Sequence, residues 1–519
     1  MLCEHERPDT VSKEAVPTNK LSTRGSWDAI SGVRPVDSTR SLGKPNTWGS
    51  DWQSLNWFRE TQASLRGRLS PVQTGILLIV TTGLNRIALK ARQDANRRFS
   101  SLAHHITPQL LNNCLLSINR RSAAGVDGQT VDEARAEFAD WSSEQLNQVH
   151  RKGYRPPPVR RVYIPKPGRK EMRPIGVPCI QDRVLQRATS KVLEQIYEQD
   201  FVPNSFGGRP EKSAHGAVST LKHTISTKKI SWVYEADIKG FFCSLNHGWL
   251  LRFVEHRIAD PRILTLIRRW LKAGVFESSG LQQVREGTPQ GGSISVLMSN
   301  IYMHYVLDIW FEKVVKPRLK GEAHLVRYID DFVVCFQLKG DADRFSKVLP
   351  KRLEKFGLQL EPTKTSLIAF GRFTVRDCKS RGVRPKTFEF LGFTFHHLHS
   401  VKGNYLVGLK TAKKKLRMSM LSLKAKLRKY RHQPLALQAK VINLHLRGHY
   451  QYFGVPLNSR SLGKLYRYTV KMWRKALSSR SQSGRINWSK YNTILKHHPL
   501  EGPRLRYSQP AFRAVGITM

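Results

Sequence analysis

The sequence has 519 residues and carries 87 Lys and Arg against 39 Asp and Glu, a formal net charge of +48 at pH 7. Its length suits about three or four domains, and its hydrophobic content of 40% is enough for packed cores. Six scattered cysteines exclude a zinc ribbon and a disulfide framework and fit a reducing compartment, while the excess of cations indicates a polyanionic partner.

Residues 1–75 form a polar N-terminal extension that is rich in Ser, Thr, Pro and Gly. We interpret it as loosely ordered, with tryptophans that dock on a partner or on the body of the protein: Trp27, Trp48, Trp52 and Trp57. The apolar run at 76–80 is too short to span a bilayer, and no secretory signal precedes it. We therefore expect no membrane partner and a cytoplasmic location of bacterial type, associated with the nucleoid or with RNA.

Residues 76–119 follow a helical pattern and lead into a Gly-rich turn at 123–128. Next, residues 160–178 indicate short strands on either side of a Gly turn, with many cations. This arrangement suits cations that reach over a triphosphate, and a basic surface hairpin is the alternative. The segment after it places four apolar residues on one side of a helix: Val184, Ala188, Val192 and Ile196.

The strand predicted at 231–238 carries an acid, Asp237, near its end. A turn at 239–247 follows and leads into a helix. Further on, the Gly-rich loop at 287–293 precedes a helical pattern that reaches Asp308. Glycines let a backbone approach a nucleotide or a nucleic-acid strand closely, although many junctions between a loop and a helix have a similar sequence.

Two adjacent carboxylates, Asp330 and Asp331, stand between apolar runs at 325–326 and 332–336. The pattern predicts two short strands joined by a tight turn, with the acids at its tip. Asp is common in turns, but adjacent like charges repel each other, and Asp237 supplies a third acid in a matching setting. Because magnesium prefers carboxylate oxygens, these acids indicate a site for two metal ions that supports phosphoryl transfer.

Residues 401–519 contain 26 Lys and Arg but a single acid, Glu501. An apolar stripe runs along a predicted helix whose other sides are cationic, through Leu416, Met420, Leu423, Leu427 and Tyr430. We interpret this region as binding a polyanion, because no acids balance its charge and each phosphate contact releases counterions. The alternatives are a solvated basic face and a membrane-surface helix, and the length of the basic region disfavours the second.

Eight short blocks of the sequence resemble, in order, those of the group II intron-encoded reverse transcriptase/maturase family. The blocks lie at residues 125–128, 163–176, 206–215, 236–242, 289–302, 328–331, 360–365 and 390–393. The resemblance is strong over about residues 120–395 and looser at 446–453, which resemble the maturase-specific region. One block alone is a weak signal, whereas eight in the family's order are a strong one.

The resemblance implies an α+β fold of the right-hand polymerase type. Its fingers would lie within residues 76–230. Its palm, an antiparallel sheet with helices, would be residues 231–396. An α-helical thumb with the maturase region would follow in residues 401–480, and a basic segment in residues 481–519. Asp237, Asp330 and Asp331 would be the catalytic residues and would hold two Mg²⁺ ions, with Mn²⁺ as a substitute. Because successive strand residues face opposite ways, we expect Asp237 and Asp330 to bridge the ions and Asp331 to contribute less.

The resemblance also implies the roles of residues that bind substrates. Lys166 and Arg173 would contact the incoming triphosphate, and Phe242 would be a steric gate that excludes a 2′-hydroxyl. Gln290, Gly291 and Gly292 would lie near the nascent base pair, with Tyr328, Ile329 and Lys364 also near the active site. Cations of the thumb would hold nucleic acid by its phosphates: Lys413, Lys414, Arg417, Lys424, Arg428 and Arg447.

The implied reaction is RNA-directed DNA polymerisation, in which a primer 3′-hydroxyl attacks the α-phosphate of a dNTP. An RNA template, a DNA primer and dNTPs would be the partners, with an intron RNA as a further candidate, and the oligomeric state is open. Catalysis would rest on positioning and electrostatics.

Several positions depart from the family's pattern. Ile329 stands where the family commonly has Ala, and some free-standing enzymes of this type, associated with host DNA repair, share this Ile. Val296 stands where Pro is frequent, and no Cys-paired endonuclease module is expected after the thumb. Three functions therefore stay open: a polymerase with intron splicing and mobility, the same polymerase in DNA repair by annealing and extending 3′ ends, and an RNA-binding splicing cofactor with an idle polymerase.

Overall fold

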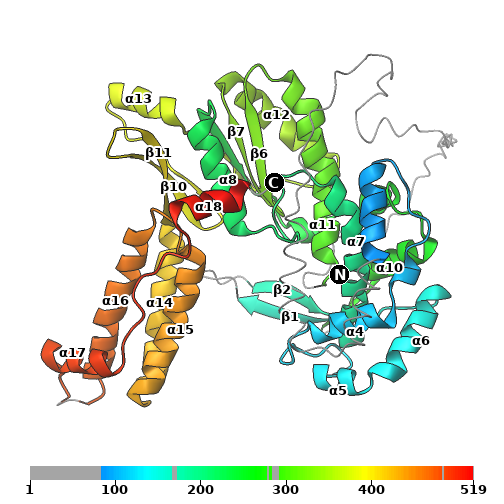
Figure 1. Cartoon of the computed structure of the whole chain (residues 1–519), viewed down its shortest axis with the longest axis horizontal. Coiled ribbons are helices and arrows are strands. Elements are labelled where there is room, and N and C mark those ends of the chain that lie inside the picture. Colours follow the sequence, from blue (N-terminus) through cyan, green and yellow to red (C-terminus); the bar gives the residue numbers. More distant parts are fainter. Residues whose placement is uncertain (1–82, 166–171, 278–279, 283–291, 482–483, 518–519) are drawn as a thin grey trace, which may run out of the picture. The chain divides into compact units, whose positions relative to one another are not determined.

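The computed structural model describes residues 83–165, 172–277, 280–282, 292–481 and 484–517. The fold mixes helices with largely antiparallel sheets, as Figure 1 shows. Among these residues, none of the helices combines the length and the apolar character that crossing a bilayer requires.

A β-hairpin lies in the central sheet. β6 (Ala323–Tyr328) pairs antiparallel with β7 (Asp331–Phe336), which confirms the hairpin that the apolar runs predict. β3 (Trp232–Ala236) pairs antiparallel with β7 on one side and with β8 (Ser366–Ala369) on the other, giving the strand order β6-β7-β3-β8. Because β3 and β7 run in opposite directions, the end of β3 lies beside the start of β7.

Both faces of this sheet are covered by helices. Val333 and Cys335 of β7 pack in a cluster with residues of α8 (Ala214–Thr227), whereas Phe336 contacts Phe345 of α12 (Lys339–Glu354). This division follows from the strand period of two, which turns alternate side chains to opposite faces. Burial on both faces therefore fixes the register of the hairpin.

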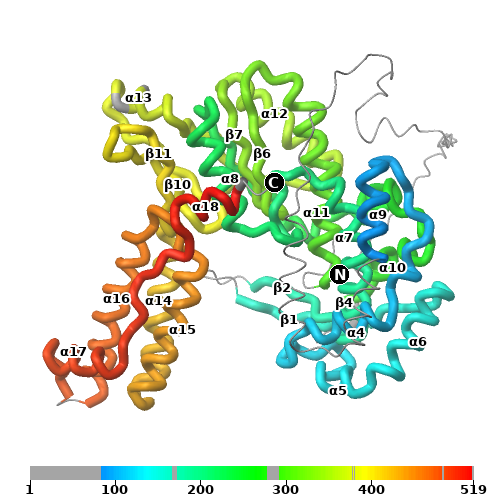
Figure 2. Tube along the Cα trace, in the orientation of Figure 1, coloured from blue at the N-terminus to red at the C-terminus, as the bar shows by residue number. Residues whose placement is uncertain are grey.

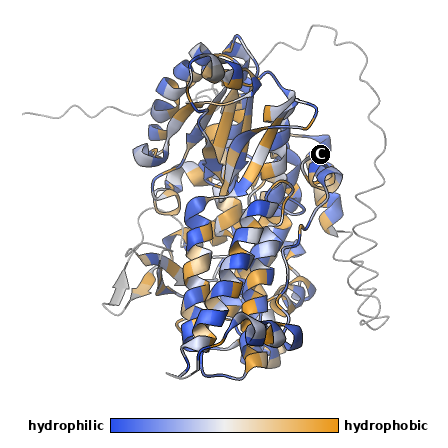
Figure 3. Ribbon diagram, turned by 90° about the vertical axis from the view of Figure 1, so that its left-hand side faces the viewer, coloured by the Kyte–Doolittle hydropathy of each residue, from blue (hydrophilic) through white to orange (hydrophobic). Residues whose placement is uncertain are grey.

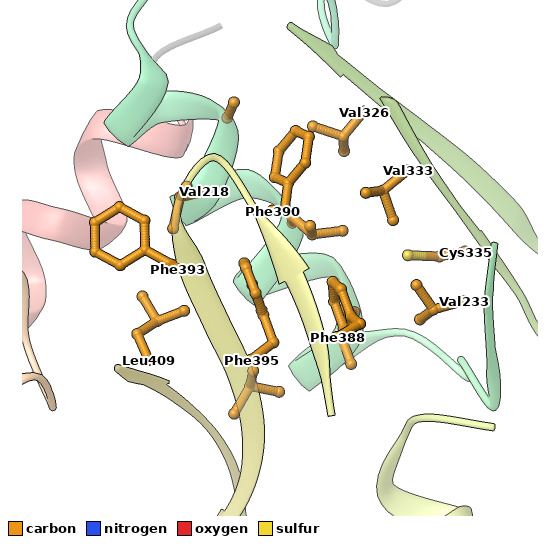
Figure 4. Packing of buried hydrophobic residues seen from close by; sticks show 14 of the residues in the cluster. Val218, Val233, Val326, Val333, Cys335, Phe388, Phe390, Phe393, Phe395 and Leu409 are labelled. Carbon is orange, nitrogen blue, oxygen red and sulfur yellow. The ribbon is translucent and has the colours of Figure 1, made fainter. Parts of the chain in front are cut away.

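The cluster beside α8 extends into a second sheet of order β11-β10-β9. Figure 4 shows phenylalanines of β9 (Phe388–Phe390) and β10 (Phe393–His399) packing with valines of the central sheet. β10 also pairs antiparallel with β11 (Tyr405–Thr411), and α13 (Arg372–Ser380) precedes these strands. A shared apolar core thus joins residues that lie far apart in the sequence.

A third sheet, of order β2-β1-β4-β5, is formed by strands that lie between residues 159 and 282. β1 (Val159–Pro165) pairs antiparallel with β2 (Met172–Val177) and parallel with β4 (Val275–Glu277), which pairs with β5 (Gly280–Gln282). Several helices in the part of the chain before residue 283 begin at side chains that accept a backbone N–H: Thr107, Ser213, Asn246 and Asp260. Besides α8, this part of the chain contains the following helices: residues 83–93, η1 (Ala103–His105), α4 (Pro108–Leu116), α5 (Val131–Ala136), α6 (Phe138–His150), α7 (Ile180–Asp200), α9 (His247–Glu255) and α10 (Pro261–Lys272).

The helix after the Gly-rich loop is not regular. α11 (Ser295–Met303) continues into two π-helical turns, η3 (His304–Asp308) and η4 (Phe311–Val315), and then into a 3-10 turn, η5 (Lys316–Arg318). The apolar periodicity predicts one continuous helix here. Backbone carbonyls in the π region find a side-chain donor instead, because Arg352 of α12 donates to Tyr305 O at 3.1 Å and Val306 O at 3.0 Å.

The basic C-terminal region folds mainly into helices. α14 (Lys413–Lys429), α15 (Leu435–Phe453) and α16 (Ser459–Ser478) share one apolar core, which also takes in α17 (Trp488–His497). Figure 3 shows these long helices as a mixture of hydrophilic and hydrophobic residues. Leu423 and Leu427 of the predicted stripe are buried, and Leu416 and Met420 pack against the same core.

The end of the chain returns to the central sheet. Figure 2 traces the last segment from α17 to α18 (Gln509–Ile517), which packs against α8. On the way, Arg506 N–H donates to Gly454 O at 2.6 Å, and His215 of α8 lies within hydrogen-bonding distance of Tyr507 Oη and Tyr452 O. The segment therefore connects α15 with the helix that covers the sheet.

Candidate active site

The register of the central sheet brings three acids together. Ala236 lies opposite Phe332 in the pairing of β3 with β7, so Asp237 and Asp331, one residue further on, are neighbours. Their carboxyl groups are close enough for Asp237 to raise the pKa of Asp331. Asp330 occupies the two-residue turn of the hairpin, because Tyr328 and Asp331 pair with each other on either side of it.

The three acids affect one another's ionisation. Burial, followed by the charges of Asp330 and Asp237, raises the pKa of Asp331 from 3.8 to about 7. Burial and the charge of Asp237 also raise the pKa of Asp330, whereas Lys364 and Arg173 lower it. Asp331 nevertheless keeps an exposed surface, so a cation from solvent can reach it. Full ionisation of all three acids is therefore unfavourable unless a cation binds there.

The chemistry of these donors fits magnesium. Within the described ranges, no three or more His, Cys, Asp or Glu side chains are placed so that they alone could hold a metal ion, and the three acids do not form such a group. Mg²⁺ does not need one, because it usually keeps several waters and binds one or two carboxylates together with substrate phosphates. Asp237, Asp330 and Asp331 are therefore candidate ligands for ions that arrive with a substrate.

Two cations lie beside the acids. Lys364, at the end of the 3-10 turn η6 (Pro362–Lys364), forms an ion pair with Asp237. Its turn is held there because the N–H of Glu361 donates to the carbonyl of Asp237 at 2.8 Å. Arg173 of β2 is close enough to Asp330 to lower its pKa. The resemblance implied both cations near this site, and the structure brings both to the acids.

Phe242 follows Asp237 in the 3-10 turn η2 (Phe241–Cys243), which begins after Gly240 in a left-handed conformation with φ of 58°. Its ring is half-buried and packs edge-on against the buried Phe241, with the centroids 5.4 Å apart. The turn thus begins soon after Asp237 and carries this aromatic ring directly behind the acid in the sequence.

The Gly-rich loop is described only at its end. Gly292 is buried beside α7, where a Cβ atom would lie 2.9 Å from Ser295 Oγ and 3.0 Å from Gln186 Oε1, so another residue would require these side chains to shift. Lys166, Gln290 and Gly291 lie outside the described residues. Their predicted roles stay predictions.

Most of the predicted nucleic-acid contacts are exposed on α14. Lys413, Lys414, Arg417, Lys424 and Arg428 are all exposed. Arg447, on α15, is exposed but forms an ion pair with Glu501, the one acid of residues 401–519. That pair raises the pKa of Arg447, and it makes Arg447 less available to a phosphate than the cations of α14.

Sequence reasoning missed the residues that hold the hairpin turn. Arg327 is fully buried and bonds Asp308, Asn300 and the carbonyl of Ile329. One signal was present in the sequence: Arg327 interrupts an apolar strand next to the acids. Another was Asp308, which falls on the apolar side of a predicted helix. A charged residue in such a position needs a partner of opposite charge when it is buried.

Comparison with known proteins matches residues 164–395 to a family described as reverse transcriptase (RNA-dependent DNA polymerase). The protein YkfC of Escherichia coli is 35% identical over 234 residues, which are 44% of this chain and 61% of that protein. The group II intron-encoded protein LtrA of Lactococcus lactis subsp. cremoris is 34% identical over 223 residues, 43% of this chain and 37% of that protein. A 91 kDa protein in the cob intron of Schizosaccharomyces pombe, described as uncharacterized, is 34% identical over 187 residues, 36% of this chain and 22% of that protein. The matched segment includes all three acids and the strands β3, β6 and β7 next to them.

Proposed function

We propose that this chain, whose residues 164–395 match a reverse transcriptase family and are similar to group II intron-encoded proteins, is an RNA-directed DNA polymerase. Because the match spans only 61% of one relative and 37% of another, the activity of the chain is inferred from its own site. The observation that carries the proposal is the register of β3 with β7, which sets Asp237 beside Asp331 with Asp330 in the adjoining turn.

In this proposal the three carboxylates hold Mg²⁺, or Mn²⁺ in its place, at the primer end. The bound ions would neutralise charge on the triphosphate and activate the primer hydroxyl. The raised pKa values of Asp330 and Asp331 support this role: burial and then the charges of neighbouring carboxylates disfavour their ionised forms, and a divalent cation would offset both effects. Lys364 would hold Asp237 in place through their ion pair.

Substrate binding would come from the elements next to the acids. Arg173 of β2 would contact the triphosphate, together with Lys166 at the neighbouring turn. Phe242 would pack under the sugar and exclude a ribonucleotide, and Gln290 with its glycines would face the nascent base pair. The chain would have the right-hand arrangement, with fingers in 76–230, palm in 231–396 and a thumb in 401–480 whose cations hold the template–primer duplex.

Primer extension tests the polymerase proposal. With an RNA template, a DNA primer, dNTPs and Mg²⁺, the parent protein should extend the primer and Asp330→Ala should not. Loss of a metal ligand should lower the rate by several orders of magnitude, since one preorganised electrostatic contact alone is worth about 10²–10³-fold. Glu312→Gln is the control, because Glu312 is a surface acid paired with Lys316. Extension by Asp330→Ala at the parental rate would refute the assignment.

The biological setting is a separate proposal. Relatives are described as group II intron-encoded proteins and as a nuclear intron maturase, so intron RNA binding, splicing and mobility are the first setting. Purified protein should then bind a group II intron RNA encoded around its reading frame and promote its splicing. The absence of any such RNA structure in the flanking DNA would count against this setting.

DNA repair is the second setting, and Ile329 favours it. This side chain stands beside the acids at a position where the family commonly has Ala, and free-standing repair-associated enzymes are expected to share it. In this setting the protein should anneal two DNA strands with short complementary 3′ ends and extend them. A protein that copies RNA but extends no annealed ends would argue against it.

A further inference from the structure

A single buried arginine connects four segments around the hairpin turn. Arg327, the last residue but one of β6, has no exposed side-chain surface. Its Nε and Nη2 donate to the two oxygens of Asp308 at 2.8 and 2.6 Å. Its Nη1 donates to Asn300 Oδ1 at 3.0 Å and to Ile329 O at 2.8 Å, and Nη2 also donates to Ser205 Oγ at 2.8 Å. The guanidinium thus ties the turn to α11, to the π-helical turn η3 and to the segment before α8.

The carbonyl that Arg327 holds belongs to a residue in an unfavourable conformation. Ile329 has φ of 60°, a left-handed value that is rare for a β-branched side chain. Such a residue persists when its surroundings determine its conformation, and it is common at functional sites. Arg327 therefore contacts the residue of the turn whose backbone conformation is unfavourable, Ile329.

The backbone under the turn restricts it further. A Cβ atom on Gly207 would lie 2.4 Å from Ile329 Cγ1 and 2.6 Å from Ile329 N, so only glycine fits there. Asn300 Nδ2 donates to Gly207 O at 2.7 Å, while Asn300 Oδ1 accepts from Arg327. One amide side chain therefore fixes both the guanidinium and the Gly207 segment that supports the turn.

The irregular helix supplies the anion of this network. Asp308 is the last residue of η3, and its side chain is fully buried against Arg327. A π-helical turn changes the direction in which the following residues point compared with a regular helix, and such turns are frequent at functional sites. The π-helical turn therefore has an identifiable consequence at the site, the bidentate pair between Asp308 and Arg327.

We propose that Arg327 is a positioning residue for metal binding: it fixes the carbonyl of Ile329 and thereby the direction in which Asp330 and Asp331 present their carboxylates. The proposal rests on the proposed function, because it concerns the ions that a polymerase would bind. Lysine cannot replace this arginine, since a single ammonium lacks the planar fork that reaches three segments at once. Partners that orient metal ligands typically change metal affinity or activity by about 10–100-fold when they are substituted.

Arg327→Lys tests the proposal against a matched control, Arg257→Lys. Arg257 is equally buried, pairs with Asp200 at 3.0 Å and donates to backbone carbonyls, but it lies outside the acid cluster. Mn²⁺ binding is measured by electron paramagnetic resonance on protein complexed with an RNA template, a dideoxy-terminated DNA primer and a dNTP. The Mg²⁺ dependence of primer extension and the melting temperature are measured alongside.

Arg327→Lys should raise the half-saturating Mn²⁺ and Mg²⁺ concentrations by about 10–100-fold, and saturating metal should restore much of the rate. Arg257→Lys should lower the melting temperature but leave both metal dependences at the parental values. Equal metal dependence in the parent and in folded Arg327→Lys would overturn the proposal. An equal increase of the half-saturating metal concentration in Arg327→Lys and Arg257→Lys would also overturn it.

A second pair of substitutions covers the case in which Arg327→Lys does not fold. Asp308→Asn keeps the shape of the anion and removes its charge, and Asp200→Asn is its control at the other buried pair. A selective loss of metal affinity in Asp308→Asn supports the proposal, and parental affinity overturns it. A parent protein that binds Mn²⁺ but extends no primer would refute the polymerase function instead, and the comparison of Mn²⁺ affinities would still stand.

Discussion

The charge on Asp331 changes with pH in a range that is unusual for an aspartate. Burial and two neighbouring carboxylates raise its pKa from 3.8 to about 7, and the protons are shared within the cluster. A folded-state pKa above the unfolded value means that the folded protein holds the proton more tightly. The stabilisation of the folded protein by this bound proton is therefore complete below about pH 4 and is lost as the pH rises towards 7.

Asp331→Asn should remove this dependence. In buffer with a chelator, the variant should melt at a higher temperature than the parent at about pH 8, and the difference should shrink towards about pH 5. Added Mg²⁺ should stabilise the parent more at the higher pH, because protons and the cation compete for the same oxygens. Thermal unfolding across this range is the measurement, with Glu312→Gln as a surface control. A difference between parent and variant that is constant with pH would show that Asp331 does not titrate there.

At the scale of elements, α18 is part of the core that supports the acids. Phe512 of α18 is 2% exposed and belongs to the same cluster as Val333 and Cys335 of β7. Ser219 and Thr220 of α8 donate to the carbonyls of Phe512 and Gly516 at 2.6 and 2.8 Å. The C-terminal helix thus closes the apolar face of α8.

Phe512→Ala should therefore destabilise the whole domain. Truncating a buried phenylalanine typically costs about 3–5 kcal/mol, through reduced burial and the cavity that remains. Leu505→Ala is the control, because Leu505 is 48% exposed, and a surface change of this kind is usually within about 0.5 kcal/mol. Denaturant unfolding monitored by far-UV circular dichroism measures both. Similar stabilities for the two variants would mean that α18 docks only loosely.

Local patterns in the sequence predict some of these elements and not others. The apolar runs around Asp330 predict the hairpin, and the stripe through Leu423 and Leu427 predicts α14, because each pattern has the period of its structure. Nothing local predicts that α18 packs on α8, since that contact joins residues about 290 positions apart in the chain. The π-helical turns were also missed, because their stability comes from tertiary partners such as Arg352.

The same limit applies to the candidate site. Acids and cations stand out in a sequence by type and setting, and Asp237, Asp330 and Lys364 do lie together. The buried ion pair of Arg327 with Asp308 depends on the exact packing of two segments. Pairings of this kind follow from the tertiary fold, so the sequence shows only that a buried charge needs a partner.

At the scale of the whole molecule, the 87 Lys and Arg outnumber the 39 Asp and Glu, so most of the cations cannot be neutralised by internal ion pairs. Glu501, the one acid of residues 401–519, is already paired with Arg447. The exposed cations of α14 have no comparable acid in their own region of the sequence. A net charge of +48 leaves a long-range field that attracts polyanions and weakens with salt.

Binding of an RNA–DNA duplex should therefore weaken steeply as salt rises from about 50 to 200 mM. A triple variant of Lys413, Lys414 and Arg417 to Gln should reduce the slope of log affinity against log salt by about one for each phosphate that is no longer neutralised. The control changes Lys347, Lys351 and Lys355 to Gln, three exposed cations in or next to α12, and so removes the same charge elsewhere. Fluorescence anisotropy with a labelled duplex measures both slopes. If the two triple variants lower the slope equally, the attraction comes from net charge alone, and α14 is not the surface that holds the duplex.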